Sequence, residues 1–166
     1  MLLNFFQKQA KKIETPPVDA PGPEIAYDPA LVAALTQQHR DLVTMLLKAS
    51  SLAAQKRYDD VTEALAQFKA VLQEHLKRET TELHPYLAKH LKGENSKDLV
   101  KQMRHDTVMA ERAVEGLIDH YMGYHVSERT VTRFSAELES ASEEFSARLE
   151  REEAAFYTLY QAAETY

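Results

Sequence analysis

Apolar side chains recur every three or four residues over four long stretches of the chain, with polar residues between them. Successive residues of an α-helix turn by about 100°, so this spacing gathers the apolar side chains on one face of a helix. The pattern predicts helices over residues 29–56, 59–91, 95–123 and from 127 to near the C-terminus. The expected N-terminal caps are Asp28 before Pro29, Asp59 or Asp60, Asn95 or Ser96, and Ser127.

The loops between these helices are short, and short loops join neighbours that run antiparallel. We therefore expect an all-α domain over residues 29–166, an antiparallel four-helix bundle that runs up, down, up and down. Pro85 should kink the second helix or end it early, because proline lacks the backbone N–H that a helix interior uses.

Residues 1–28 form a separate N-terminal arm in this scheme. Residues 1–13 combine leucine, phenylalanine and isoleucine with three lysines, and five of the six prolines of the chain fall within residues 14–29. The prolines indicate a linker. We expect the amphipathic start to pack on its own domain or on a partner chain, and contact with a membrane surface is the alternative.

Composition removes several classes of function. The 166 residues include no cysteine, which excludes disulfides, thiolate metal sites and cysteine nucleophiles and favours a cytoplasmic location. The net charge of -6 makes nucleic acid an unexpected partner. The sequence has no phosphate-binding glycine loop and no nucleophile–base constellation, so we do not expect an enzyme.

Ionisable residues interrupt the apolar faces of three helices. His39 lies at the centre of the first face, His75 and Glu79 lie together on the second, and Glu152 lies on the fourth with Arg148 at its edge. Burying an unpaired charge costs several kcal/mol, which is comparable with the whole stability of a domain. These side chains must therefore satisfy one another or hold a metal ion.

The third helix carries a histidine that does not fit this group. His105 projects about 140° away from the centre of the apolar face and is expected to face water. Thr107 points inward instead, and Asp106 lies near the edge of the apolar face.

Other polar and aromatic residues are expected to lie away from the centre. Glu82 points inward and is either a spare ligand or a carboxylate that approaches solvent near the bundle end, and we favour solvent. Surface roles are expected for His84, His90, His120 and His125, which lie near helix ends or loops. One of the core or rim tyrosines could reach the polar group as a hydrogen-bonding partner or oxygen ligand; these are Tyr86, Tyr121, Tyr157 and Tyr160.

The polar set resembles that of the hemerythrin-like (HHE) cation-binding domains, over about residues 30 to 160. The matching residues are His39 in QQHRDL, His75 and Glu79 in EHLKRETTELHPYL, and Glu152 in RLEREEAAFY. The resemblance implies a four-helix bundle whose typical members hold two non-haem irons bridged by carboxylates. A histidine and a glutamate four residues apart share one helix face and can ligate one ion together.

Two positions depart from the family pattern. Arg148 stands where the family usually has its fourth-helix histidine, and Thr107 stands where the third-helix histidine is expected. The resemblance assigns the remaining ligands, His39, His75, Glu79 and Glu152, to one half of the centre. We therefore predict a single metal ion, with Arg148 supplying positive charge in place of the second iron and pairing with Glu152 or Asp106.

Two imidazoles and two carboxylates suit iron, manganese or zinc. With iron, the resemblance implies binding of O2 or NO, or a role in redox or iron sensing. The alternative is a metal-free bundle in which Arg148 bonds Glu152 and Glu79 and each histidine bonds a carboxylate. Such a bundle would serve as an interaction or regulatory module for a protein partner or as a homo-oligomer.

Overall fold

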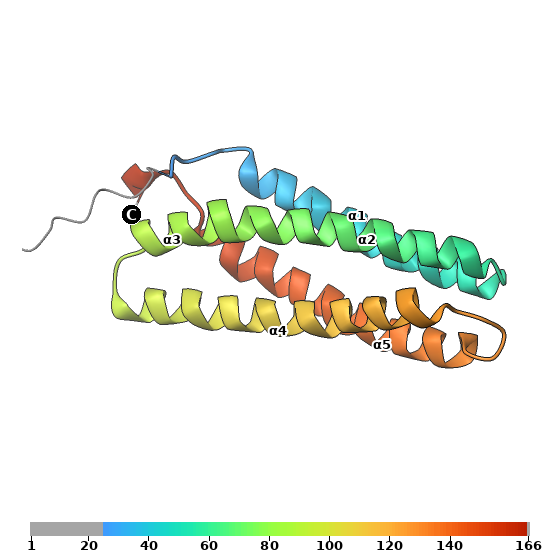
Figure 1. Ribbon diagram of the computed structural model, residues 1–166. Coiled ribbons are helices and arrows are strands. Elements are labelled where there is room, and N and C mark those ends of the chain that lie inside the picture. The colour runs from blue at the N-terminus through green and yellow to red at the C-terminus, as the bar shows by residue number, and fades with distance from the viewer. Residues whose placement is uncertain (1–24, 166) are drawn as a thin grey trace, which may run out of the picture.

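The computed structural model describes residues 25–165, apart from the side chains of residues 94–96 and 110. Over this range the chain forms a bundle of long antiparallel helices, as Figure 1 shows. The predicted all-α architecture is confirmed, and the predicted arm lies mostly outside the described residues. The long helices are α1 (Leu31–Ala54), α2 (Tyr58–Arg78), α4 (Glu94–Tyr124) and α5 (Val131–Arg151).

All four predicted helix starts are wrong by one to four residues, and the observed N-terminal caps are Ala30, Arg57, Gly93 and Thr130. The third helix begins at Glu94, directly after Gly93, whose positive φ of 96° favours a residue without a Cβ. The fourth begins at Val131 because Ser127 opens a turn, in which its carbonyl accepts the Val131 N–H at 2.8 Å. Both differences lie at the bundle ends and leave the helix faces unchanged.

The second and the last helix each widen into a π turn, and Pro85 does not end the second helix. α2 passes into η1 (Glu79–Leu83) and then α3 (His84–His90), whereas α5 passes into η2 (Glu152–Phe156) and the 3-10 turn η3 (Tyr157–Leu159). Pro85 lies in the first turn of α3, where its missing N–H costs little. A second 3-10 turn, η4 (Ala163–Thr165), follows near the C-terminus.

The hydrophobic core consists of two clusters. The larger cluster contains Leu42 to Ala53 of α1 and Phe134 to Leu149 of α5, and the smaller one contains Leu31 and Leu35 together with Phe156 and Tyr160. α1 and α4 contribute to both clusters, whereas α2 and α5 contribute to the larger one and the segments that continue them, η1–α3 and η2–η3, contribute to the smaller one. Each of these four stretches of chain carries a buried polar residue between its two contributions. A polar layer therefore crosses the bundle between two apolar regions; its buried members are His39, His75, Glu79, Thr107, Arg148 and Glu152.

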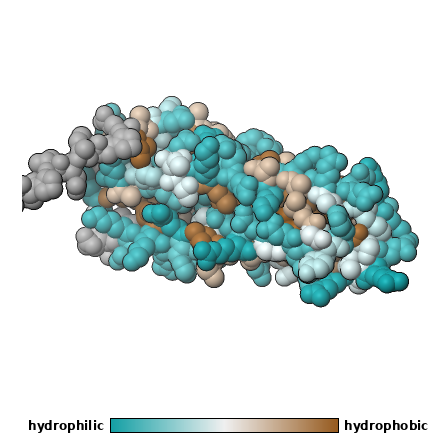
Figure 2. All heavy atoms as spheres, in the orientation of Figure 1, coloured by the Kyte–Doolittle hydropathy of each residue, from teal (hydrophilic) through white to brown (hydrophobic). Residues whose placement is uncertain are grey.

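The outside of the bundle is largely hydrophilic, and Figure 2 shows apolar side chains only in small groups on the visible face. No helix among the described residues is long and apolar enough to cross a membrane. Near the C-terminus, the Asp28 N–H donates to the Tyr160 hydroxyl at 2.9 Å, which fixes the entry to α1.

Candidate metal centre

Four buried side chains from three helices meet in the polar layer. His39 comes from α1, His75 from α2, Glu79 from the start of η1, which continues α2, and Glu152 from the start of η2, which continues α5. Each is at most 3% exposed, and one ligand atom from each lies within 4.8 Å of the others. The α-helical spacing of His75 and Glu79 places both on one face, as expected for residues four apart. The structure thus brings together the four residues that the sequence nominated.

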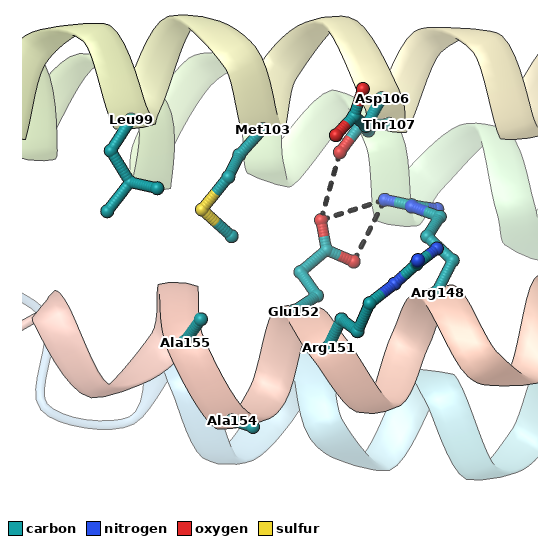
Figure 3. Close-up of a pocket in the computed structure, with 9 residues that line it drawn as sticks. All are labelled: Leu99, Met103, Asp106, Thr107, Arg148, Arg151, Glu152, Ala154 and Ala155. Atoms are coloured by element: carbon teal, nitrogen blue, oxygen red, sulfur yellow. Dashed lines mark hydrogen bonds and ion pairs between the residues drawn. The ribbon is translucent and has the colours of Figure 1, made fainter.

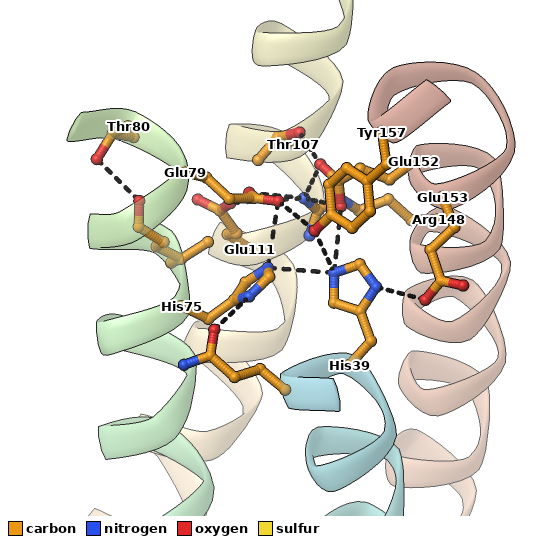
Figure 4. A network of polar contacts seen from close by, with 12 residues as sticks. His39, His75, Glu79, Thr80, Thr107, Glu111, Arg148, Glu152, Glu153 and Tyr157 are labelled. Carbon is orange, nitrogen blue, oxygen red and sulfur yellow. Dashed lines mark hydrogen bonds and ion pairs between the residues drawn. The ribbon is translucent and has the colours of Figure 1, made fainter. Parts of the chain in front are cut away.

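The two imidazoles are oriented by hydrogen bonds at their outer nitrogens. His39 Nδ1 lies 2.8 Å from Glu153 Oε1, and His75 Nδ1 lies 3.2 Å from Gln38 Oε1. Both partners are acceptors, so each Nδ1 carries the hydrogen and donates it. In a neutral imidazole the lone pair is then on Nε2, the atom that points into the layer (Figure 4).

When both imidazoles are neutral, the centre of the layer contains more acceptors than hydrogens. The two Nε2 atoms are 3.3 Å apart, and His75 Nε2 is also 3.3 Å from Glu79 Oε1. The Tyr157 hydroxyl lies 2.9 Å from both His39 Nε2 and Glu79 Oε1, but its single hydrogen can satisfy only one of them. Burial and the neighbouring His75 lower the pKa of His39 to about 4, so His39 is neutral at pH 7. A cation among these atoms would remove the mismatch, and the donor set therefore fits a metal ion.

The two carboxyl groups differ in their affinity for a proton. Burial alone would raise the pKa of Glu79, but the hydrogen bond from His75 and the positive charges of His75 and Arg148 outweigh it and lower the pKa to about 2. Burial, followed by the negative charge of Glu79, raises the pKa of Glu152 to about 8, against the opposing effect of Arg148. Without a metal ion the pair holds one charge at neutral pH, as close carboxyl groups do.

Arg148 supplies the positive charge on the α4 side of the layer. Its Nη2 donates to both oxygens of Glu152 at 2.8 Å, and the Thr107 hydroxyl donates to Glu152 Oε1 at 3.1 Å (Figure 3). Arg148 is also 3.7 Å from Glu79 Oε2. Asp106 is exposed and forms no ion pair with Arg148, so that part of the predicted pairing is wrong: the inward-pointing carboxylates are nearer to the guanidinium.

The π turns begin at the two candidate carboxylates. The His84 N–H donates to the carbonyl of Glu79, and the Tyr157 N–H donates to the carbonyl of Glu152. A π turn contains one residue more than an α turn, so the residue five positions on returns to the same face. This geometry places Tyr157 above Glu152 and turns its hydroxyl into the layer.

His84 is buried, and the prediction that it lies at the surface is wrong. It is 2% exposed, and neither ring nitrogen has a hydrogen-bond partner among the described residues. Burial lowers its pKa to about 4. The extra residue of the π turn rotates α3 by about 100° relative to a continued α-helix, which carries His84 inward. The prediction that His105 faces water is confirmed. Glu82 approaches solvent, as predicted, and pairs with Arg78 there.

Several residues of the polar layer were not predicted from the sequence to lie there. Gln38 and Glu153 orient the imidazoles from positions next to the apolar faces. Glu111 lies one turn after Thr107 on α4, and burial raises its pKa to about 7. A spacing of four residues from Thr107 was the available signal for Glu111, but it also fits a solvated glutamate.

A cavity of about 340 Å3 leads from the surface to the α5 side of this layer (Figure 3). Leu99, Met103 and Ala155 make its apolar wall, and Thr107 and Glu152 lie at its polar end. A small molecule could reach Glu152 by this route.

Comparison with known proteins gives one finding on relatedness. The family model described as the hemerythrin HHE cation-binding domain matches residues 30–160. Neither the curated proteins nor the solved structures yielded a match. The matched range spans the whole bundle and includes all four candidate ligands. The chain therefore belongs to the hemerythrin HHE cation-binding domain family.

Proposed function

We propose that this protein binds a single divalent transition-metal ion through His39, His75, Glu79 and Glu152. The observation that carries the proposal is the excess of acceptors in the layer: two Nε2 atoms 3.3 Å apart, with Glu79 Oε1 3.3 Å from one of them. Acceptor lone pairs at this separation repel one another unless a cation lies among them. Glu153 and Gln38 support ligation because they hold the hydrogens on the outer nitrogens.

The donor set favours iron, manganese or zinc. Imidazole nitrogen is a ligand of intermediate hardness and carboxylate oxygen is a hard one, and these ions accept both. Iron would supply a redox-active cation that can coordinate O2 or NO, and the cavity beside Glu152 gives a small molecule a way in. We therefore propose a cytoplasmic sensor or binding protein for a diatomic ligand, redox state or iron. Reversible O2 carriage of the kind that uses two irons is not expected of a one-metal centre.

We propose a binding role and not an enzymatic one. Each imidazole already uses Nδ1 to contact an acceptor and directs Nε2 at the other ligands, which leaves neither ring placed as a general base toward the cavity. The readout of a sensor would require a protein partner or a second copy of the chain.

The second candidate is a metal-free module, which the bidentate pairing of Arg148 with Glu152 favours. In that case a proton on His75 would take the role of the metal ion, shared with Glu79 at 3.3 Å. The layer would then be a structural element, and the bundle would act through its surface.

Metal analysis separates the two candidates. We expect protein purified from cells supplemented with iron and manganese to hold about one tightly bound ion per chain. The variants H75A and E79Q should lose it, whereas H105A, which changes an exposed histidine, should keep it. An absence of metal under all supplements, or equal metal content in H75A and H105A, would overturn the proposal. Two ions per chain would contradict the one-metal centre.

A further inference from the structure

Three carboxylates surround the guanidinium of Arg148. Its Nη2 is 2.8 Å from both oxygens of Glu152, 3.7 Å from Glu79 Oε2 and 3.9 Å from Glu111 Oε1. All four side chains are at most 12% exposed. Figure 4 shows the guanidinium between these groups, which come from η1, α4 and η2. We call Glu79, Glu111 and Glu152 the carboxylate cradle.

Arg148 uses only part of its hydrogen-bonding capacity in this arrangement. Nε and Nη1 have no hydrogen-bond partner among the described residues, and neither do Glu79 Oε2 and Glu111 Oε1. Unmatched buried donors therefore lie beside unmatched buried acceptors. Buried donors and acceptors that form no hydrogen bond destabilise the folded state. The cradle thus offers the guanidinium a second position, closer to Glu111 and Glu79 and farther from Glu152.

A metal ion at the proposed centre would compete with Arg148 for Glu152. Both oxygens of Glu152 accept hydrogen bonds from Nη2, and one of them is among the atoms that would ligate the ion. If Glu152 turns to the ion, Arg148 needs another acceptor within reach. Glu111 Oε1, at 3.9 Å from Nη2, is near enough to be reached by a movement of about 1 Å in a long, flexible side chain.

The charges of the two states support this exchange. One divalent ion and one guanidinium carry three positive charges, and the three ionised carboxylates of the cradle carry three negative charges. The ion, Arg148 and the cradle together are then neutral with all three carboxylates deprotonated. Without Glu111 the ion, Arg148 and the two ligand carboxylates would keep one excess positive charge, offset only by the partly exposed Glu153 behind His39.

We propose that Glu111 supports metal binding at the centre: it receives the Arg148 guanidinium when Glu152 turns to a bound ion. This inference rests on the function proposed above and assigns a role to a residue outside the four ligands. Glu111 is accordingly a positioning residue, which acts on the metal ion through Arg148.

A double-mutant cycle with Mn(II) tests the coupling of Glu111 to Arg148. The affinity of the full chain for Mn(II) is measured from the electron paramagnetic resonance signal of the free ion, for wild type, E111Q, R148M and the double variant. We expect E111Q to bind Mn(II) about 10-fold more weakly than wild type, because Arg148 then stays on Glu152. In the R148M background the same substitution should change the affinity by less than about twofold. E144Q, an exposed glutamate of α5, should match wild type.

The outcomes distinguish this inference from the proposed function. Wild type that binds neither Mn(II) nor Fe(II) would overturn both. Wild type that binds one ion, with E111Q indistinguishable from E144Q, would overturn only the role of Glu111. An equal effect of E111Q with and without Arg148 would also overturn it, because Glu111 would then act directly.

Stability of the metal-free protein provides a second measurement that does not depend on metal affinity. Glu111 is not the acceptor of Arg148 in this state, so E111Q should shift the urea midpoint much less than R148M does. Equal shifts would mean that Glu111 already holds Arg148, and the proposed transfer would be wrong. If E111Q does not fold, E111D replaces it in the double-mutant cycle. This variant keeps the negative charge but shortens the side chain by one methylene, and we expect it to bind Mn(II) about threefold more weakly than wild type.

Discussion

Removing the guanidinium of Arg148 should destabilise the metal-free protein in a strongly pH-dependent way. In R148M the ionised Glu79 loses its buried counter-charge and takes up a proton, in addition to the proton that Glu152 already holds at neutral pH. The pKa of Glu79 in the folded state then rises from about 2 to above its ordinary value of 4.5, so the cost relative to wild type grows as the pH rises. Each pH unit below the new pKa corresponds to about 1.4 kcal/mol, so the destabilisation should be about 2.8 kcal/mol larger at pH 7.5 than at pH 5.5.

Urea denaturation in the presence of a chelator measures this effect as the difference in free energy of unfolding between wild type and R148M. The matched control is R151M, which removes an exposed arginine of the same helix and should change stability by less than about 0.5 kcal/mol. Mn(II) at 100 times its Kd should restore about 2.7 kcal/mol to any variant that still binds the ion. A destabilisation of R148M that is the same at both pH values, or no larger than that of R151M, would refute the electrostatic account of the layer.

Three further predictions concern the ligands and their surroundings. Replacing Thr107 and Arg148 together by histidine should raise the iron content toward two per chain, measured by elemental analysis; an unchanged content would mean that the family ligands do not map to these positions. The variant E153Q should weaken Mn(II) binding about 10-fold, because it weakens the acceptor that holds the hydrogen on His39 Nδ1, and titration would show no change if that contact is incidental. For His84, burial lowers the folded-state pKa from 6.5 to about 4, so the unfolded chain binds the proton first and stability falls as the pH drops below 6.5. Between pH 7 and pH 5, the free energy of unfolding of H84L should therefore fall by about 2 kcal/mol less than that of wild type, as measured by urea denaturation. Equal decreases in the two proteins would contradict the burial of a neutral ring.

The helix faces and the four candidate ligands could be predicted because α-helical periodicity holds along most of the chain. His39, His75 and Glu79 lie within or at the end of regular α-helices, where a rotation of about 100° per residue gives the direction of each side chain. Thr107 and His105 were separated correctly, inward and outward, for the same reason.

The periodicity fails beyond the π turns, and the errors and omissions gather there. His84 follows η1 and Tyr157 follows η2, so a projection that assumes α geometry misplaces one and leaves the other among several tyrosines. Pro85 gave a partial signal, since the missing N–H disturbs the helix at this point, but it does not reveal an extra residue in the turn. Glu111 was missed because a glutamate beside Arg112 and Glu115 in a helix has the pattern of a solvated surface.

The polar layer between the two apolar clusters also constrains how the helices slide along one another. A shift of one helix by a turn, about 5.4 Å, would set a carboxylate or imidazole against leucine or phenylalanine of a neighbouring helix. Such a mismatch leaves a charge buried among apolar side chains without a partner, whereas helices that pack only through leucines can shift at little cost. The polar layer therefore fixes the register of the helices in the bundle, with or without an ion. A chain in which leucines replaced the whole layer could unfold at higher urea and yet lose its single alignment, visible as broadened or multiple NMR resonances.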